Sequence, residues 1–237
     1  LKVGYTAVGE FHYLHRDPEG RAYADPCEMG NGIIEASQRT GIGVTLLPVL
    51  YSIGGYGAVA PNNGQRRYIL DIDEFLDVFR RHHTNHIDQP QICIGIAPHS
   101  VRQVPAEALI EALKGYRDLS QNGPVHIHVA EQKRDVDDHL KHTGNRPVSW
   151  LFENIGVDHR WCLVHSTHMT EIETVAVANS GAVVGLCPST EANLGDGFFP
   201  LSKYLTAAGS WGIGSDSHVS VNPWEELRWL EYGQRLR

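Results

Sequence analysis

Seven short runs of β-branched and aliphatic residues alternate along the chain with longer segments of helical period. Strands separated by helices form parallel βα units, whereas the strands of a sandwich follow one another through short turns. A chain of 237 residues is also near the size of one β/α barrel. The pattern therefore predicts an α/β fold, a TIM-type (β/α)8 barrel, as one domain over residues 1–237. The seven expected strands cover residues 3–10, 43–51, 91–97, 124–130, 161–165, 182–187 and 212–215.

Two of the intervening helices have clear start signals. Asp71 precedes a stripe of apolar residues, and Thr170 with Glu173 has the spacing of a capping box. The segment 52–70, rich in Gly, Asn and Pro, is long for a βα connection. We expect it to be a substrate-binding loop, because barrels carry such loops at the carboxyl ends of their strands.

The charge of the chain excludes several classes of partner. The net charge is −8 with His counted as neutral, and the 20 Lys and Arg residues are scattered without a run. We therefore expect a small-molecule substrate rather than nucleic acid or an anionic membrane. No apolar run reaches the roughly 18 residues of a membrane span, and the four separate cysteines are typical of reduced thiols. These features predict a cytoplasmic protein, and a homodimer through outer helices is compatible with them.

The segment His126 to Glu131 ends one expected strand with residues that suit metal binding and proton transfer. His126 and His128 project to the same face of a strand, and Glu131 follows just beyond its end. A neutral imidazole binds a divalent metal, and a nearby carboxylate can move a proton. An isolated HxH is equally compatible with half-buried polar residues of an ordinary strand.

Two other strand ends favour the metal site over ordinary strand residues. His165 closes the run 161–165, and Asp216 follows the run 212–215. Catalytic groups of a β/α barrel come from the ends of several strands, so these side chains are expected at one site. Asp216 could ligate a metal and take a proton from water, although it could also cap a helix. No Lys ends the run 91–97, which indicates one metal ion rather than two bridged by a modified lysine.

Three residues are candidates for substrate binding. His99 and Arg102 follow the run 91–97, and Tyr13 follows the first run. An Arg near a buried metal site is costly unless it pairs with an anion, so a substrate carboxylate is its simplest partner. Arg102 could instead lie at a surface helix end, and Tyr13 could simply pack as an aromatic. The group His82, His83 and His86 resembles a metal cluster, but we expect it on the solvated face of a helix.

With these residues identified, the chain resembles the amidohydrolase superfamily, its cytosine-deaminase-like branch, and within that branch the formiminoglutamate deiminase family. The similarity lies in five segments and covers nearly the whole length. The HxxE element, His128 to Glu131, and the SD element, Ser215-Asp216, are shared by the branch. The segments that begin at Glu10 and at Pro98 are more specific to the family. The segments are Glu10-Phe11-His12-Tyr13, Pro98-His99-Ser100-Val101-Arg102, His126 to Glu131, Val164-His165 and Ser215-Asp216.

The resemblance implies a role for each of these side chains. It makes His128 and Asp216 ligands of one divalent metal, most simply Zn²⁺, with iron or manganese also compatible. It makes Glu131 the proton shuttle and His165 the residue that positions the attacking water. Tyr13, His99 and Arg102 would bind the glutamate part of N-formimino-L-glutamate, an intermediate of histidine breakdown. Asp216 would accept a proton from water, and Glu131 would protonate the nitrogen that leaves as ammonia.

In the family, the first barrel strand ends in an HxH pair that supplies two further metal ligands, and no such pair precedes Leu1. We therefore expect the chain to correspond to strands two to eight, without the first strand and without the family's small β-sandwich domain. Catalytic zinc sites generally use three protein ligands, so the chain by itself is expected to bind zinc poorly and to have little activity.

Two alternatives remain. One is another deaminase of the same branch that acts on a heterocycle of the guanine, cytosine or adenosine type, which aromatic residues at the site would favour. The other is a non-catalytic chain, either an inactive fragment or a binding module, which the absent HxH pair would favour. Retention of His128, Glu131, His165 and Asp216 together argues against this second alternative.

Overall fold

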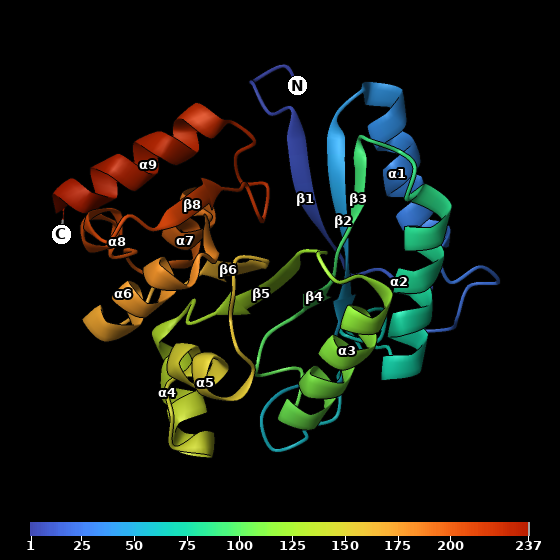
Figure 1. Ribbon diagram of the computed structural model, residues 1–237, viewed down its shortest axis with the longest axis horizontal. Helices are drawn as coiled ribbons and strands as arrows, with labels where there is room; N and C mark the ends of the chain where they lie inside the picture. The colour runs from blue at the N-terminus through green and yellow to red at the C-terminus, as the bar shows by residue number, and fades with distance from the viewer. Residues whose placement is uncertain (237) are drawn as a thin grey trace. The chain divides into compact units, whose positions relative to one another are not determined.

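The computed structural model describes residues 1–236, and these form two compact units. The first unit comprises Leu1 and Tyr5–His126, and the second comprises residues 2–4 and 127–236. Each unit is built from parallel strands joined by helices, which confirms the predicted α/β class (Figure 1). That the whole chain forms a single domain stays a prediction.

The first unit holds a parallel sheet of order β1-β2-β3, with β4 also paired to β2. The helices α1 and α2 pack against β2, because their apolar stripes face the sheet (Figure 1). The elements are β1 (Ala7–His12), α1 (Glu28–Thr40), β2 (Gly43–Leu50), α2 (Ile72–His86), β3 (Ile92–Ile94), β4 (Ala97–Pro98) and α3 (Ala106–Leu119).

The strand predicted over residues 91–97 is divided between β3 and β4. Gly95 lies at the break, and a Cβ there would come within 2.6 Å of the carbonyl oxygen of Pro124. Only glycine allows this close approach of two backbones. The next residue, Ile96, forms a parallel bridge with Val125 instead of pairing with β2. The single predicted strand is therefore one run that pairs with β2 at both ends and contacts Val125 at its middle.

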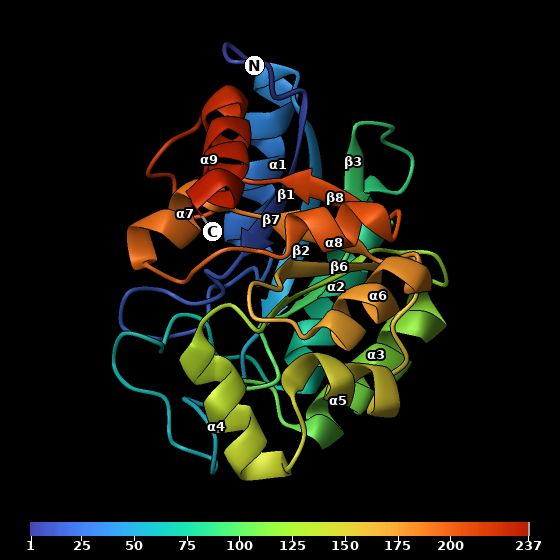
Figure 2. The same cartoon turned by 90° about the vertical axis from the view of Figure 1, so that its left-hand side faces the viewer.

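The second unit holds four hydrogen-bonded neighbours in the order β5-β6-β7-β8, with β6, β7 and β8 paired in parallel. Helix α6 packs against α8, and α7 packs against α9 (Figure 2). The elements are β5 (Val125–Val129, whose first two residues belong to the first unit), α4 (Lys133–Thr143), α5 (Pro147–Asn154), β6 (Trp161–His165), α6 (Glu171–Ser180), β7 (Val183–Leu186), α7 (Pro188–Leu194), α8 (Leu201–Thr206), β8 (Ser210–Ile213) and α9 (Pro223–Leu236).

Two strand boundaries differ from the prediction. β1 begins at Ala7 rather than at residue 3, because Gly4 has φ of 115° and ends any extended run before it. β8 begins at Ser210, two residues before its predicted start, and pairs with Val183 of β7. Both strands nevertheless end close to the residues predicted to carry chemistry.

The predicted helix starts are confirmed. The Asp71 carboxylate accepts from the backbone N–H of Glu74 at 2.8 Å, and the Thr170 hydroxyl accepts from that of Glu173 at 3.2 Å. Each glutamate in turn accepts from the backbone N–H of its cap residue, which completes a capping box. Between residues 1 and 236, no helix is long and apolar enough to cross a membrane.

Candidate functional site

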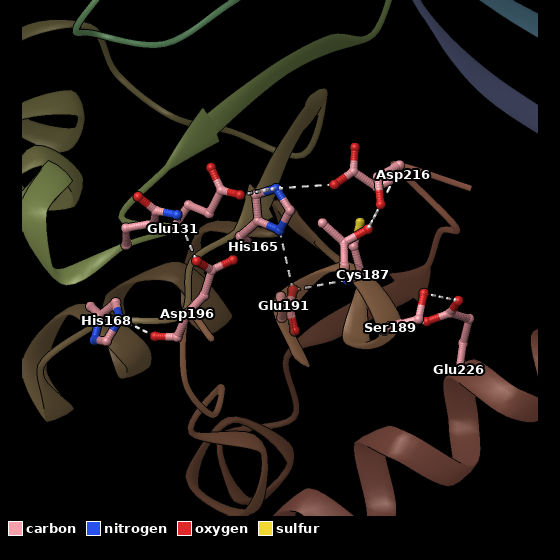
Figure 3. Close-up of polar contacts among 12 residues, drawn as sticks. Glu131, His165, His168, Cys187, Ser189, Glu191, Asp196, Asp216 and Glu226 are labelled. Carbon is pink, nitrogen blue, oxygen red and sulfur yellow. Dashed lines mark hydrogen bonds and ion pairs between the residues drawn. The ribbon is translucent and has the colours of Figure 1, made fainter. Parts of the chain in front are cut away.

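The second unit brings four of the sequence-predicted side chains together at the ends of its strands. The His165 ring stacks beside that of His128, with centroids 5.6 Å apart. His165 Nε2 lies 3.5 Å from Glu131 Oε1 and 3.9 Å from Asp216 Oδ2 (Figure 3). The structure therefore brings His128, Glu131, His165 and Asp216 together, and the roles predicted for them stay predictions.

The backbone at these strand ends is unusual. Left-handed φ angles occur at Ala130 (50°), His165 (64°), Ser166 (51°) and Asp216 (44°). Residues with a Cβ rarely adopt such angles, and they persist only where the surrounding packing enforces them. The side chains of His165 and Asp216 converge at these turns, with Nε2 and Oδ2 3.9 Å apart.

The electrostatics of His165 are set by carboxylates. Burial by itself would lower the pKa of the ring. The hydrogen bond to Glu191 and the charges of Glu131, Glu191 and Asp216 outweigh it, so the pKa is raised above its usual value. The pKa of Glu131 is also raised, first by burial and then by the charges of nearby carboxylates, although His165 opposes the shift. A carboxyl with a raised pKa is suited to giving up and retaking a proton.

Three side chains that could hold a metal ion lie at the same place. One ligand atom each from His165, Cys187 and Asp216 lie within 4.8 Å of one another. Nitrogen, sulfur and carboxylate oxygen are all donors that zinc accepts. His128, which the sequence predicts as a ligand, lies outside this group and contacts it through the His165 ring. The donor set therefore fits a divalent ion, and Asp216 belongs to both the predicted and the observed set.

Two residues of this site were not predicted from the sequence. Cys187 follows β7, and burial together with neighbouring carboxylates raises the pKa of its thiol well above the usual value. Glu191 lies in the first turn of α7, where its Oε1 accepts from His165 Nδ1 at 3.2 Å. The available signal was their position at and just beyond the end of the predicted strand 182–187, the strand of this sheet for which no site residue is predicted.

The first unit brings the three predicted substrate-binding residues close to one another. The ring of His99 lies edge-on to Tyr13 and to Tyr51, at centroid distances of 5.8 and 4.8 Å. Burial and the charge of Arg102 lower the pKa of His99 to about 3, so its ring is neutral. Arg102 Nε donates to Gln103 Oε1 at 3.1 Å.

Sequence reasoning missed the other aromatic members of this group. Tyr51 directly precedes the predicted loop 52–70 and Tyr68 lies near its end, and the centroids of their rings are 5.9 Å apart. Tyr68 is also 5.4 Å from Tyr13, and both pack against a small apolar core that includes Leu47 and Val49. Tyr13 thus has the aromatic packing role that was one of its two predicted roles. Its ring also lies beside His99, a polar side chain that could bind a ligand.

The prediction for the three histidines of α2 is wrong for His82. Its side chain is fully buried, and desolvation first, then the charges of His12 and His86, lower its pKa to about 4. The helical period explains the error, because Phe75, Phe79 and His82 share one face of α2. His83 and His86 are half-buried, and His83 stacks on Phe79. The described residues hold no metal-binding group at this position.

The amidohydrolase family model matches residues 1–235 of the chain. The chain belongs to the amidohydrolase family. Its fold agrees with this assignment, because the crystal structure of an amidohydrolase from Brucella melitensis superimposes with a TM-score of 0.93 at 46% identity. That match covers 99% of this chain and 52% of the other. The parallel βα arrangement is that of the TIM-type barrel enzymes of the family.

Two proteins with named activities are similar to this chain, one in sequence and one mainly in fold. The chain is 52% identical to a formimidoylglutamate deiminase from Pseudomonas aeruginosa over 100% of its own length and 51% of the relative's. Escherichia coli guanine deaminase shares the fold, with a TM-score of 0.80 at 16% identity over 100% of this chain and 51% of that one. The amidohydrolase chain thus spans about half the length of the curated relatives it matches.

Proposed function

We propose that the protein containing this chain is a metal-dependent hydrolase that deiminates N-formimino-L-glutamate. Water adds to the formimino carbon, the carbon–nitrogen bond to the terminal nitrogen breaks, and the products are N-formyl-L-glutamate and ammonia. The observation that carries the reaction class is the His165 imidazole flanked by the carboxylates of Glu131 and Asp216. The choice of substrate rests on the 52% identity to the Pseudomonas deiminase.

Asp216 and His128 would hold one divalent metal ion, most simply Zn²⁺. The converging donors of His165, Cys187 and Asp216 support an ion at this place. When bound, such an ion lowers the pKa of a water molecule toward about 7 and so supplies a nucleophile at neutral pH. Removal of the ion by a chelator should abolish turnover, and added Zn²⁺ should restore it.

The two carboxyl groups would divide the proton transfers between them. Asp216 would accept a proton from the attacking water, and its position 3.9 Å from His165 Nε2, the nitrogen that does not contact Glu191, supports this role. Glu131 delivers a proton to the departing nitrogen, and its raised pKa supports this role. His165 holds the water in line through Nε2.

The residues proposed to bind the glutamate part are Tyr13, His99 and Arg102. Arg102 supplies a fixed positive charge for a carboxylate. Tyr13 and the neutral His99 supply hydrogen-bonding groups beside it, and the contact between their rings supports a common ligand. The substrate class is thus an anionic amino acid derivative. We further propose a cytoplasmic location, which the absence of disulfides at the four cysteines supports, and a place in histidine breakdown.

A second candidate function is deamination of a heterocycle. The aromatic group Tyr13, Tyr51, Tyr68 and His99 favours it, because such rings could stack on a base. Ammonia release from N-formimino-L-glutamate, guanine, cytosine and adenosine, measured side by side on the metal-loaded full-length protein, tests the two. Turnover of the formimino compound alone supports our proposal. Turnover of a heterocycle alone shows that the role given to Arg102 is wrong, and release from none of them contradicts both.

A further inference from the structure

Glu191 has a side chain that the proposed chemistry does not use, although it is among the most buried charged groups of the second unit. It is 4% exposed, and a single oxygen, Oε1, accepts from two donors (Figure 3). These are His165 Nδ1 at 3.2 Å and the backbone N–H of Cys187 at 2.9 Å. A buried carboxylate is costly unless it is hydrogen-bonded, so this arrangement needs both donors.

The short helix α7 fixes this carboxylate in place. Its chain leaves β7 at Leu186, and Cys187 is the N-cap, so Glu191 in the first turn reaches back toward the strand ends. Ser189 lies two residues after the cap. Its backbone N–H and its hydroxyl donate to the buried carboxylate of Glu226 in α9, at 2.8 and 2.6 Å. Helix α7 is therefore attached at two points, and Glu191 has little freedom to swing away from His165.

The contact determines which nitrogen of His165 carries a proton. An ionised carboxylate can only accept, so the ring nitrogen that faces Glu191 must donate. Nδ1 lies at hydrogen-bond distance from Glu191, 3.2 Å, whereas Nε2 lies farther from its carboxylates, 3.5 Å from Glu131 and 3.9 Å from Asp216, so the proton of the neutral ring lies on Nδ1. We propose that Glu191 is a positioning residue, which holds His165 in this form and orientation for the reaction. The effect on turnover rests on the proposed function, but the effect on the ring does not.

The orientation of the ring matters because its other nitrogen works at the reacting centre. Partners of this outer kind fix the tautomer and angle of an active-site imidazole, and their loss typically reduces activity about 10- to 100-fold. A different role for Glu191 would be only to satisfy the Cys187 N–H and hold α7 in place. That role predicts a loss of thermal stability with no change at the His165 ring.

Three variants of the metal-loaded full-length protein separate these roles. Glu191→Leu fills the space but removes the acceptor. Glu191→Gln keeps an acceptor, because the Cys187 N–H pins the amide oxygen where Oε1 lies in the wild type. Ser189→Ala is the matched control, since it weakens the attachment of α7 without touching His165. The readouts are kcat, KM and the protonation of each His165 ring nitrogen at pH 8, from ¹⁵N spectra of histidine-labelled protein assigned with a His165→Asn variant.

We expect the wild type and Glu191→Gln to show a proton on Nδ1 and none on Nε2. Glu191→Leu should show a mixture of the two tautomers and a kcat lower by about 10- to 100-fold, with KM changed little. Ser189→Ala should lower the melting temperature but leave the tautomer and kcat as they are. A proton on Nε2 in the wild type overturns the proposal whether or not the variants fold, as does an unchanged tautomer in folded Glu191→Leu. Failure to release ammonia from N-formimino-L-glutamate would contradict the proposed function only, because the spectra do not depend on the substrate.

Discussion

Both units bury histidines, and the surroundings of those histidines differ. In the first unit, His12, His15 and His82 lie close together, and desolvation lowers their pKa values to about 3, 4 and 4. In the second unit, His165 is equally buried, yet its pKa is raised by three carboxylates. The comparison shows that burial alone leaves an imidazole neutral, and that carboxylate partners make the difference.

The two groups also differ in hydrogen bonding. Neither ring nitrogen of His82 has a hydrogen-bond partner among the described residues, and His15 is hydrogen-bonded through Nε2 to the Val49 carbonyl, at 3.0 Å, with no such partner at Nδ1. Both nitrogens of His165 face carboxylate oxygens. Protonation of the buried histidines of the first unit therefore destabilises the fold. His165, in contrast, is placed to exchange protons with the carboxylates around it.

The largest expected effect concerns the carboxylates around His165. Glu131→Gln keeps the size of the side chain but removes its proton transfer, so kcat should fall about 10²- to 10⁴-fold while the circular dichroism spectrum stays unchanged. Glu171→Gln, an exposed change in the same unit, is the control and should leave kcat as it is. A kcat for Glu131→Gln within threefold of the wild type would show that the carboxylate does not act in the reaction.

The histidines of the first unit should act on stability instead. Their folded pKa values lie below the usual 6.5, so the unfolded chain binds more protons between about pH 4 and 6.5. Their contribution is complete above pH 6.5 and is lost as the pH falls toward 4. His82→Leu should flatten the slope of unfolding free energy in this window by about 1.4 kcal/mol per pH unit.

Urea unfolding at a series of pH values measures this slope. Asn85→Leu is the control on the same helix, because Asn85 is exposed and carries no titrating proton. An equal slope in His82→Leu and the wild type would show that His82 does not bind a proton on unfolding.

A substitution of Arg102 tests whether its positive charge binds the carboxylate of the substrate. Loss of a hydrogen bond to a charged group costs about 1.5–3 kcal/mol, so Arg102→Ala should raise KM for N-formimino-L-glutamate about 10- to 150-fold. Arg21→Ala, at a side chain 74% exposed in the same unit, should leave KM unchanged. If KM for the anionic substrate is unaffected by Arg102→Ala, the carboxylate does not bind there.

The smallest expected effect is the loss of a helix cap, which should lower the free energy of unfolding by the same amount in both units. Asp71→Ala in the first unit and Thr170→Ala in the second each remove the cap of a capping box. Each should lower the free energy of unfolding by about 1 kcal/mol at pH 7, measured by urea denaturation. Widely different values would mean that the helices, and not only the histidines, distinguish the two units.

The sequence predicted those parts of the site that follow a strand directly. His128, Glu131, His165 and Asp216 each end or follow an apolar run, and parallel strands bring their carboxyl ends to one edge. Glu191 was not predictable in this way, because its position depends on how the chain turns from β7 into a helix of seven residues. His82 was assigned to solvent from its polar neighbours, although the spacing from Phe75 and Phe79 placed it on the buried face.

The left-handed backbone at Ala130, His165, Ser166 and Asp216 has a consequence for transplanting this chemistry into another protein. Such conformations cost about 1–3 kcal/mol each and are held only by the surrounding structure. A peptide copied from any one of these three strand ends would relax and lose the arrangement of its side chains. A grafted version would need the neighbouring strands and α7 as well, so the transferable unit is the supporting scaffold together with its side chains.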